Sequence, residues 1–122
     1  MTINEAVALA AEHTGENIGR EELVFWLSQI ENSVVTEIAA THENDTSDKT
    51  VITDMTDGDR VLFAPDPYSV LYVNYLIMKT DLALRDSAQY QNSSHAFAVS
   101  YADFADWYNR TYMPYSESRI KL

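Results

Sequence analysis

The longest apolar pattern of the chain runs from Ala64 to Gln89. Asp66 is placed to cap a first helical turn, and Pro67 fits the first helical position, where its missing N–H has no intrahelical partner. Apolar side chains then recur at helical spacing on two faces. The first face comprises Tyr68, Leu71, Tyr72, Tyr75, Met78 and Leu82, and the second comprises Val70, Val73, Ile77 and Leu84. The pattern predicts one long central helix around which other helices pack.

Two shorter helices are predicted before this segment. Thr2 and Glu5 have the spacing of a capping box, which predicts a helix from Ile3 to about His13. A break at 15–19 separates it from a second helix, predicted from Arg20 to about Thr41. The apolar face of the second helix comprises Leu23, Leu27, Ile30, Val34 and Ile38, with Trp26 beside them.

The pattern changes between about residues 43 and 66, where short β-branched runs alternate with polar turns. Runs at Thr50–Thr53 and Arg60–Ala64 flank a turn around Gly58, which predicts a β-hairpin or a long loop. Two strands are only marginally stable alone. We therefore expect this insertion to pair with helices of the same subunit or with a neighbouring chain.

A fourth helix is predicted after a polar turn at Gln91–Ser94. Its apolar stripe comprises Phe97, Tyr101, Phe104 and Tyr108, with Trp107 adjacent. Pro114 ends the helix, and residues from about 114 to 122 are expected to form a flexible tail. The patterns together predict a mainly α fold in one domain, residues 1–122. This domain is a bundle of about four helices with the hairpin or loop inserted between helices two and three.

Composition agrees with a helical globular domain. Hydrophobic residues make up 46% of the 122 residues and charged residues 22%, while three Gly and three Pro leave little material for a many-stranded sandwich. Cysteine is absent, which excludes disulfides, thiolate metal sites and a cysteine nucleophile. The N-terminal segment carries acidic residues and only a short apolar run, so we expect neither a secretory signal nor a membrane span. We expect a soluble intracellular protein, or one that is assembled into a structure made inside a cell.

The acidic balance of the chain limits its partners. Nineteen acidic residues against eight basic residues give a net charge of -11, which works against holding DNA through its phosphates. We therefore expect DNA to meet this protein only briefly, in passage along a protein surface that carries the same negative charge as the DNA.

No residue pattern predicts a catalytic, cofactor or metal site. The acids around Gly58 lack the spacing and the final glutamate of a calcium loop, so a solvated turn is the better interpretation. The three histidines are far apart and have no Ser or Asp partner at the spacing of a catalytic triad. These candidate residues are Asp54, Asp57, Asp59, His13, His42 and His95.

Asp81 is the most informative polar residue because it interrupts the apolar central helix. A buried carboxylate has to be paired or hydrogen-bonded. One interpretation is a general acid or base, which needs a partner and a pocket. The preferred one is a structural bond to a basic residue such as Arg110 or to a tyrosine hydroxyl.

The aromatic side chains have two interpretations. Eight tyrosines and two tryptophans are compatible with stacking on bases, but they fall at core spacing on helices that lack a basic groove. Core packing that extends into an oligomer interface accounts for them better.

The segment from Ala64 to Pro114 resembles small proteins encoded among the head genes of long-tailed bacteriophages and prophages. Trp26-Leu27 and Glu31 are similar as well. Within the segment, the similarity rests on Pro67-Tyr68, Leu71-Tyr72, Tyr75-Leu76, Asp81-Leu82, Tyr90-Gln91-Asn92-Ser93, Phe97, Tyr101, Trp107-Tyr108-Asn109-Arg110 and Met113-Pro114.

This resemblance implies a head-tail connector or adaptor protein, a helical subunit of a homo-oligomeric ring between the portal and the tail. It implies a structural component of the virion that is assembled in the bacterial cytoplasm and contacts portal and tail-side proteins. The alternative is a small acidic helical interaction or regulatory protein of a bacterium, and an enzyme ranks third. The residues expected to serve structure or assembly are Trp26, Tyr68, Tyr72, Tyr75, Asp81, Tyr90, Trp107 and Arg110.

Overall fold

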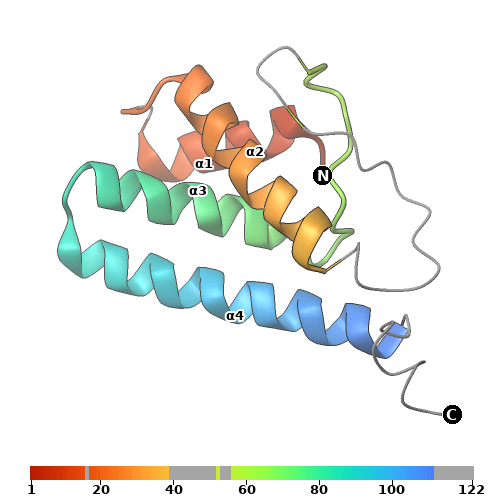
Figure 1. Cartoon of the computed structure of the whole chain (residues 1–122). Helices are drawn as coiled ribbons and strands as arrows, with labels where there is room; N and C mark the ends of the chain where they lie inside the picture. Colours follow the sequence, from red (N-terminus) through yellow and green to blue (C-terminus); the bar gives the residue numbers. More distant parts are fainter. Residues whose placement is uncertain (16, 39–51, 53–55, 112–122) are drawn as a thin grey trace, which may run out of the picture.

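The computed structural model describes residues 1–15, 17–38, 52 and 56–111, which contain four α-helices (Figure 1). They are α1 (Ile3–Thr14), α2 (Arg20–Glu37), α3 (Val70–Ala83) and α4 (Ser87–Thr111). Helix α3 packs against all three others, with α1 and α2 on one side and α4 on the other (Figure 1). The predicted mainly helical bundle of about four helices is confirmed.

The capping box of α1 forms as predicted. The Glu5 N–H donates to Thr2 Oγ1 at 3.1 Å, and the Thr2 N–H donates to Glu5 Oε1 at 3.0 Å. The helix ends at Gly15, whose φ of 73° lies in the left-handed region that glycine adopts without a steric penalty. The Gly15 N–H then donates to the Ala11 carbonyl at 2.9 Å. Local sequence signals therefore mark both ends of α1.

Helix α2 also begins where the sequence predicts, at Arg20. It ends at Glu37 with Ile38 as its C-cap, and the predicted extension to Thr41 lies outside the described residues. Its predicted apolar face is buried along its whole length, at Leu23, Leu27, Ile30, Val34 and Ile38.

The predicted single helix from Ala64 to Gln89 is wrong in length. Residues 66–69 form a turn, in which the Ser69 hydroxyl donates to the Asp66 carboxylate, and α3 begins only at Val70. The chain reverses at residues 84–86, where Arg85 has a φ of 58°. This reversal brings α4 back antiparallel along α3 (Figure 1).

The predicted start of the fourth helix is also wrong, because Gln91–Ser94 lie inside α4. The cap is Asp86 instead: the Gln89 N–H donates to Asp86 Oδ1 at 3.1 Å, and the Tyr90 N–H donates to the Asp86 carbonyl at 2.8 Å. A capping aspartate satisfies donors that have no partner within the helix. Pro114 and the predicted tail lie outside the described residues.

The N-terminus pairs with the described half of the predicted hairpin. Thr2 and Val61 form an antiparallel bridge, flanked by hydrogen bonds from the Ile3 N–H to the Arg60 carbonyl (3.1 Å) and from the Leu62 N–H to the Met1 carbonyl (2.9 Å). The described residues contain no strand, so the hairpin is not seen, and its first run lies outside them apart from Ile52. The described residues of the insertion between α2 and α3 contribute to the core, because Ile52, Leu62 and Ala64 are buried.

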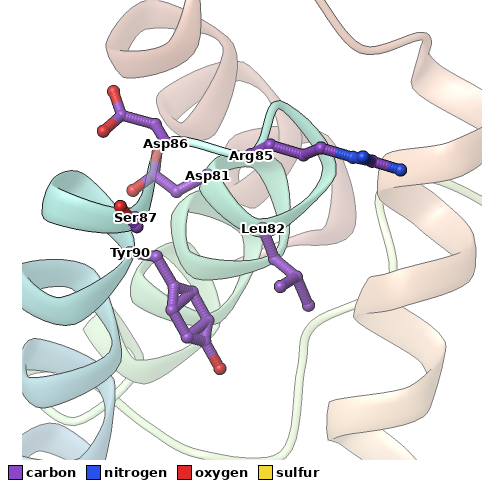
Figure 2. A pocket seen from close by; sticks show the side chains of 6 residues that line it. All are labelled: Asp81, Leu82, Arg85, Asp86, Ser87 and Tyr90. Atoms are coloured by element: carbon purple, nitrogen blue, oxygen red, sulfur yellow. The ribbon is translucent and has the colours of Figure 1, made fainter.

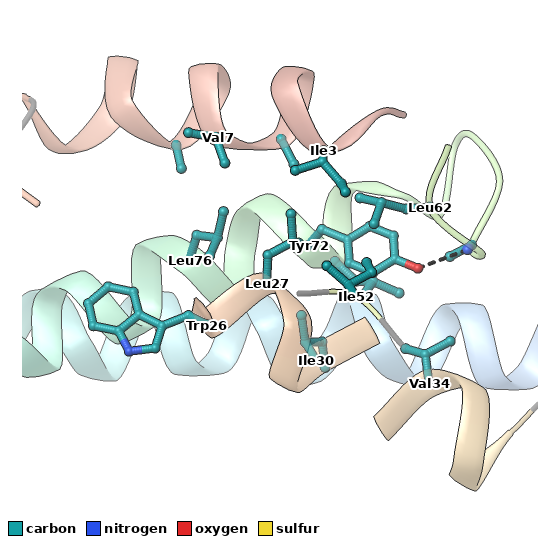
Figure 3. Packing of buried hydrophobic residues seen from close by; sticks show 14 of the residues in the cluster. Ile3, Val7, Trp26, Leu27, Ile30, Val34, Ile52, Leu62, Tyr72 and Leu76 are labelled. Carbon is teal, nitrogen blue, oxygen red and sulfur yellow. Dashed lines mark hydrogen bonds between the residues drawn. The ribbon is translucent and has the colours of Figure 1, made fainter. Parts of the chain in front are cut away.

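One hydrophobic core joins the helices (Figure 3). Figure 3 shows Leu76 and Tyr72 of α3 between Val7 and Ile3 of α1 and Leu27 of α2. The predicted second apolar face of α3 is only partly correct. Val73 is buried, whereas Val70 and Leu84 are 46% and 50% exposed.

Candidate functional site

A hydrogen-bonded pair of polar side chains, Glu31 and Tyr72, is enclosed in the core between α2 and α3. The Tyr72 hydroxyl donates to Glu31 Oε1 at 2.5 Å and accepts from the Ala64 N–H at 2.9 Å. The Phe63 N–H donates to the other carboxylate oxygen, Oε2, at 2.8 Å. We call Glu31, Tyr72 and the backbone of residues 63–64 the buried network; it ties the segment before α3 to both helices.

Burial sets the proton affinities within the buried network. Loss of solvent raises the pKa of Glu31, and the hydrogen bonds from Tyr72 and Phe63 and the charge of Arg60 oppose this rise. Loss of solvent and the Glu31 carboxylate raise the pKa of Tyr72 well above its ordinary value, so its proton stays on the hydroxyl. Glu31 is 2% exposed and Tyr72 is 0% exposed. A substrate therefore has no access to either side chain, and the geometry supports a structural bond.

The raised pKa of Glu31 predicts a pH dependence of stability. Its ordinary value is 4.5, so the folded chain binds this proton more tightly than the unfolded chain. The stability that protonation provides is fully present below pH 4.5 and is lost as the pH rises through the raised pKa. Because Glu31→Gln cannot titrate, the stability of the native chain relative to this variant should fall as the pH rises across that window.

Urea unfolding of both proteins, from below pH 4.5 to above neutrality, measures this difference. The variant carries every other acid of the chain, so the difference between the two curves isolates Glu31. A difference that is constant over the whole range would contradict the prediction.

Tyr68 and Trp107, both predicted as structural residues, meet in an aromatic cluster between the start of α3 and the end of α4. Their rings stack with centroids 5.1 Å apart and planes at 25°. Phe104 is 0% exposed and lies at the centre, with ring centroids 5.8–6.3 Å from those of its four neighbours. These neighbours are Phe63, Tyr68, Trp107 and Tyr108. The cluster supports the core-packing interpretation of the aromatic stripe.

Tyr75 of the predicted set lines an open groove formed by side chains of α2, α3 and α4. The groove has a volume of about 290 Å³, and we call it the aromatic groove. Its lining residues are Ile30, Ser33, Glu37, Tyr75, Phe97 and Tyr101.

The aromatic groove combines aromatic rings with a carboxylate. The Phe97 ring lies 5.1 Å from Tyr75 and 5.7 Å from Tyr101, between centroids. The Tyr101 hydroxyl donates to Glu37 Oε2 at 3.0 Å. Partial burial and this contact raise the pKa of Tyr101 to about 12. Partial burial also raises the pKa of Tyr75, so both tyrosines keep their protons at neutral pH, and the groove is lined by aromatic rings and one acidic side chain.

Asp81 and Tyr90 line a second open pocket, of about 280 Å³, at the turn between α3 and α4 (Figure 2). Asp81 is half-buried, and its Oδ2 accepts from the Ser93 hydroxyl at 2.7 Å. The suggested partners, Arg110 or a tyrosine, are therefore wrong. Arg110 lies near the other end of α4, where its Nε donates to the Asp106 carbonyl at 3.2 Å.

Trp26 is buried at the N-terminal half of α2, and the Lys79 ammonium lies 5.9 Å from its ring centroid. This distance is within the range of a cation–π interaction. The predicted site residues therefore divide among separate places in the fold: Trp26 under Lys79, Tyr72 in the buried network, Tyr75 in the aromatic groove, and Tyr68 with Trp107 in the cluster.

The remaining candidates form no common site. Within the described part of the chain, no three His, Cys, Asp or Glu side chains are arranged to hold a metal ion. The Asp57 carboxylate accepts from the Asp59 N–H at 3.0 Å, as in a local turn. His13 and His95 are exposed on different helices, and Asp54 and His42 lie outside the described residues. No helix among the described residues has the length and apolar character that crossing a membrane requires.

Glu31 is the buried polar residue that sequence reasoning about sites missed. It stands four residues after Leu27 and three before Val34, on the buried face of α2. A carboxylate at such a position signals a buried polar bond. Its partner Tyr72 is 41 positions away, so no local pattern identifies the pair.

Comparison of the whole chain with protein-family models, with curated proteins and with solved structures finds no match.

Proposed function

We propose that this chain is a structural virion component without catalytic activity, a subunit of a head-tail connector ring between the portal and the tail of a tailed phage. The proposal begins from the resemblance to connector proteins. That resemblance involves two separate parts of the sequence, a short part at residues 26–31 and a longer one at 64–114.

The observation that carries the proposal is the contact between these two parts. Glu31 belongs to the short part and Tyr72 to the long one, and their side chains bond at 2.5 Å in the core. Tyr68 and Trp107, from opposite ends of the long part, stack on each other. The residues on which the resemblance rests thus pack against one another in one core. Such packing is expected if this chain shares its fold with the connector proteins.

The charge supports the same role. Copies that each carry a net charge of -11 would surround a channel with negative potential, so DNA would pass without being held. The chain also exposes large apolar side chains at several places: Phe25 on α2, Val61 in the segment before α3 and Val99 on α4 are 47–66% exposed. Such side chains suit contacts with the portal, with tail-side proteins and with other copies.

The test is to purify phage particles from a bacterium that carries this gene and to identify their proteins by mass spectrometry. The chain should be present in many copies per particle. A strain in which the gene is disrupted should yield filled heads without tails. Intact particles from the disrupted strain, or particles that lack the chain, would contradict the proposal and favour a bacterial interaction or regulatory protein.

A further inference from the structure

The turn between α3 and α4 exposes two leucines beside a cation. Leu82 and Leu84 are 51% and 50% exposed, and Arg85 between the two helices has a φ of 58°. The Arg85 side chain extends away from Asp81 and Asp86 (Figure 2). We call Leu82, Leu84 and Arg85 the turn knob. Exposed leucines around a projecting guanidinium are typical of a contact surface.

The aromatic groove has the complementary chemistry. A guanidinium is attracted to the faces of tyrosine and phenylalanine rings and forms charge-assisted hydrogen bonds with a carboxylate. Tyr75, Phe97 and Tyr101 supply the rings, and Glu37 supplies the carboxylate. Lys79 is the one basic residue of α3. Its ammonium lies over the Trp26 ring, and Lys79 is not among the residues that line the groove.

A turn knob cannot reach the aromatic groove of its own chain. Phe97 and Tyr101 are 10 and 14 residues after Ser87, the first residue of α4, which places them about 15 and 21 Å from it along the helix at a rise of about 1.5 Å per residue. This distance is greater than the reach of an arginine side chain. The knob and the groove can therefore meet only between two copies.

We propose that the turn knob of one copy docks in the aromatic groove of a second copy, with Arg85 against Glu37 and the aromatic rings. The proposal concerns the self-assembly step and in this respect rests on the proposed function. Copies of a chain with a net charge of -11 repel each other. Arg85 is one of only eight basic residues, so its attraction to a carboxylate determines where two copies meet.

The contact is heterologous, because the two surfaces belong to different parts of the chain. Each added copy leaves one knob and one groove available, and growth stops only when the arrangement closes into a ring. The same pair of surfaces thus accounts for assembly from a single type of subunit.

A charge exchange tests the contact. The assembly state of the full chain is measured by analytical ultracentrifugation over a range of concentrations. Arg85→Glu and Glu37→Arg should each weaken association at least tenfold, and the double variant should recover at least half of the loss on a logarithmic scale. Arg20→Glu is the matched charge control, since Arg20 is exposed at the start of α2, bonds Asn4 of α1 and belongs to neither surface, and this variant should associate like the native chain.

Arg85→Gly adds a second test that separates folding from assembly. Glycine adopts the left-handed conformation freely, so this variant should keep or raise the melting temperature and still lose association. Single variants that associate like the native chain, a double variant without recovery, or a native chain that stays monomeric at every concentration would each overturn the proposal. Presence in phage particles is measured separately, so a failed charge exchange with the chain in particles refutes the contact alone.

Discussion

Replacing Glu31 with Ala should lower the free energy of unfolding by about 3–5 kcal/mol. The change leaves the Tyr72 hydroxyl and the Phe63 N–H without their acceptor in the core. Each unsatisfied buried donor costs about 1–3 kcal/mol, and the missing side chain adds a cavity term. The loss is large because Glu31 is 2% exposed and water cannot replace the carboxylate.

Glu37→Ala provides a matched control for this prediction. Glu37 lies on the same helix and also accepts a hydrogen bond from a tyrosine hydroxyl, that of Tyr101, at 3.0 Å. It is exposed, so water can replace the lost bond, and the expected cost is below about 1 kcal/mol. Urea denaturation at neutral pH measures both variants. Equal losses of unfolding free energy for Glu31→Ala and Glu37→Ala would show that the buried network contributes no more to stability than an exposed hydrogen bond.

The first two helices were predictable because their signals are local. Thr2 and Glu5 satisfy each other's backbone donors, and Gly15 adopts the one conformation that ends α1. The apolar residues of α2 recur on one face, and that face is the buried one. Capping and periodicity act over a few residues, so the sequence contains all the information that these elements need.

The reversal between α3 and α4 was not predictable from the same signals. Residues 84–86 contain no Gly or Pro, and Arg85 adopts a left-handed φ that a helical pattern does not suggest. The local evidence was Asp86 followed by Ser87, a capping aspartate before a helical first position. The packing of the two helices against each other stabilises the reversal, and packing lies outside a local pattern.

The partners of the polar side chains depend on tertiary packing in the same way. Asp81 bonds Ser93 because α4 returns antiparallel over α3, whereas one uninterrupted helix would hold the two residues far apart. The backbone of the segment before α3 forms hydrogen bonds with the N-terminal residues and with the Glu31 carboxylate, which precede it by many residues. Periodicity showed which faces are apolar, but the contacts between faces emerged only with the fold.

Phe104→Ala should lower the free energy of unfolding by about 3–5 kcal/mol, the usual range for removing a fully buried aromatic side chain. Phe104 is 0% exposed and lies in contact with Phe63, Tyr68, Trp107 and Tyr108. Its ring fills the space between the end of α4, the start of α3 and the segment before it. Removal leaves a cavity that rigid neighbouring rings cannot close, so both the transfer energy and the ring contacts are lost.

For a domain of this size, a loss of that magnitude corresponds to a melting temperature lower by about 10–20 °C. Thermal unfolding followed by circular dichroism measures the shift. Val99→Ala on the same helix is the control, because Val99 is 47% exposed and its loss should change the melting temperature by only about 1–2 °C. A small shift for Phe104→Ala, comparable to that of the control, would mean that the aromatic cluster does not hold the end of α4 against α3. In that case the stacking of Tyr68 on Trp107 would no longer support a common packing scheme for the 64–114 segment.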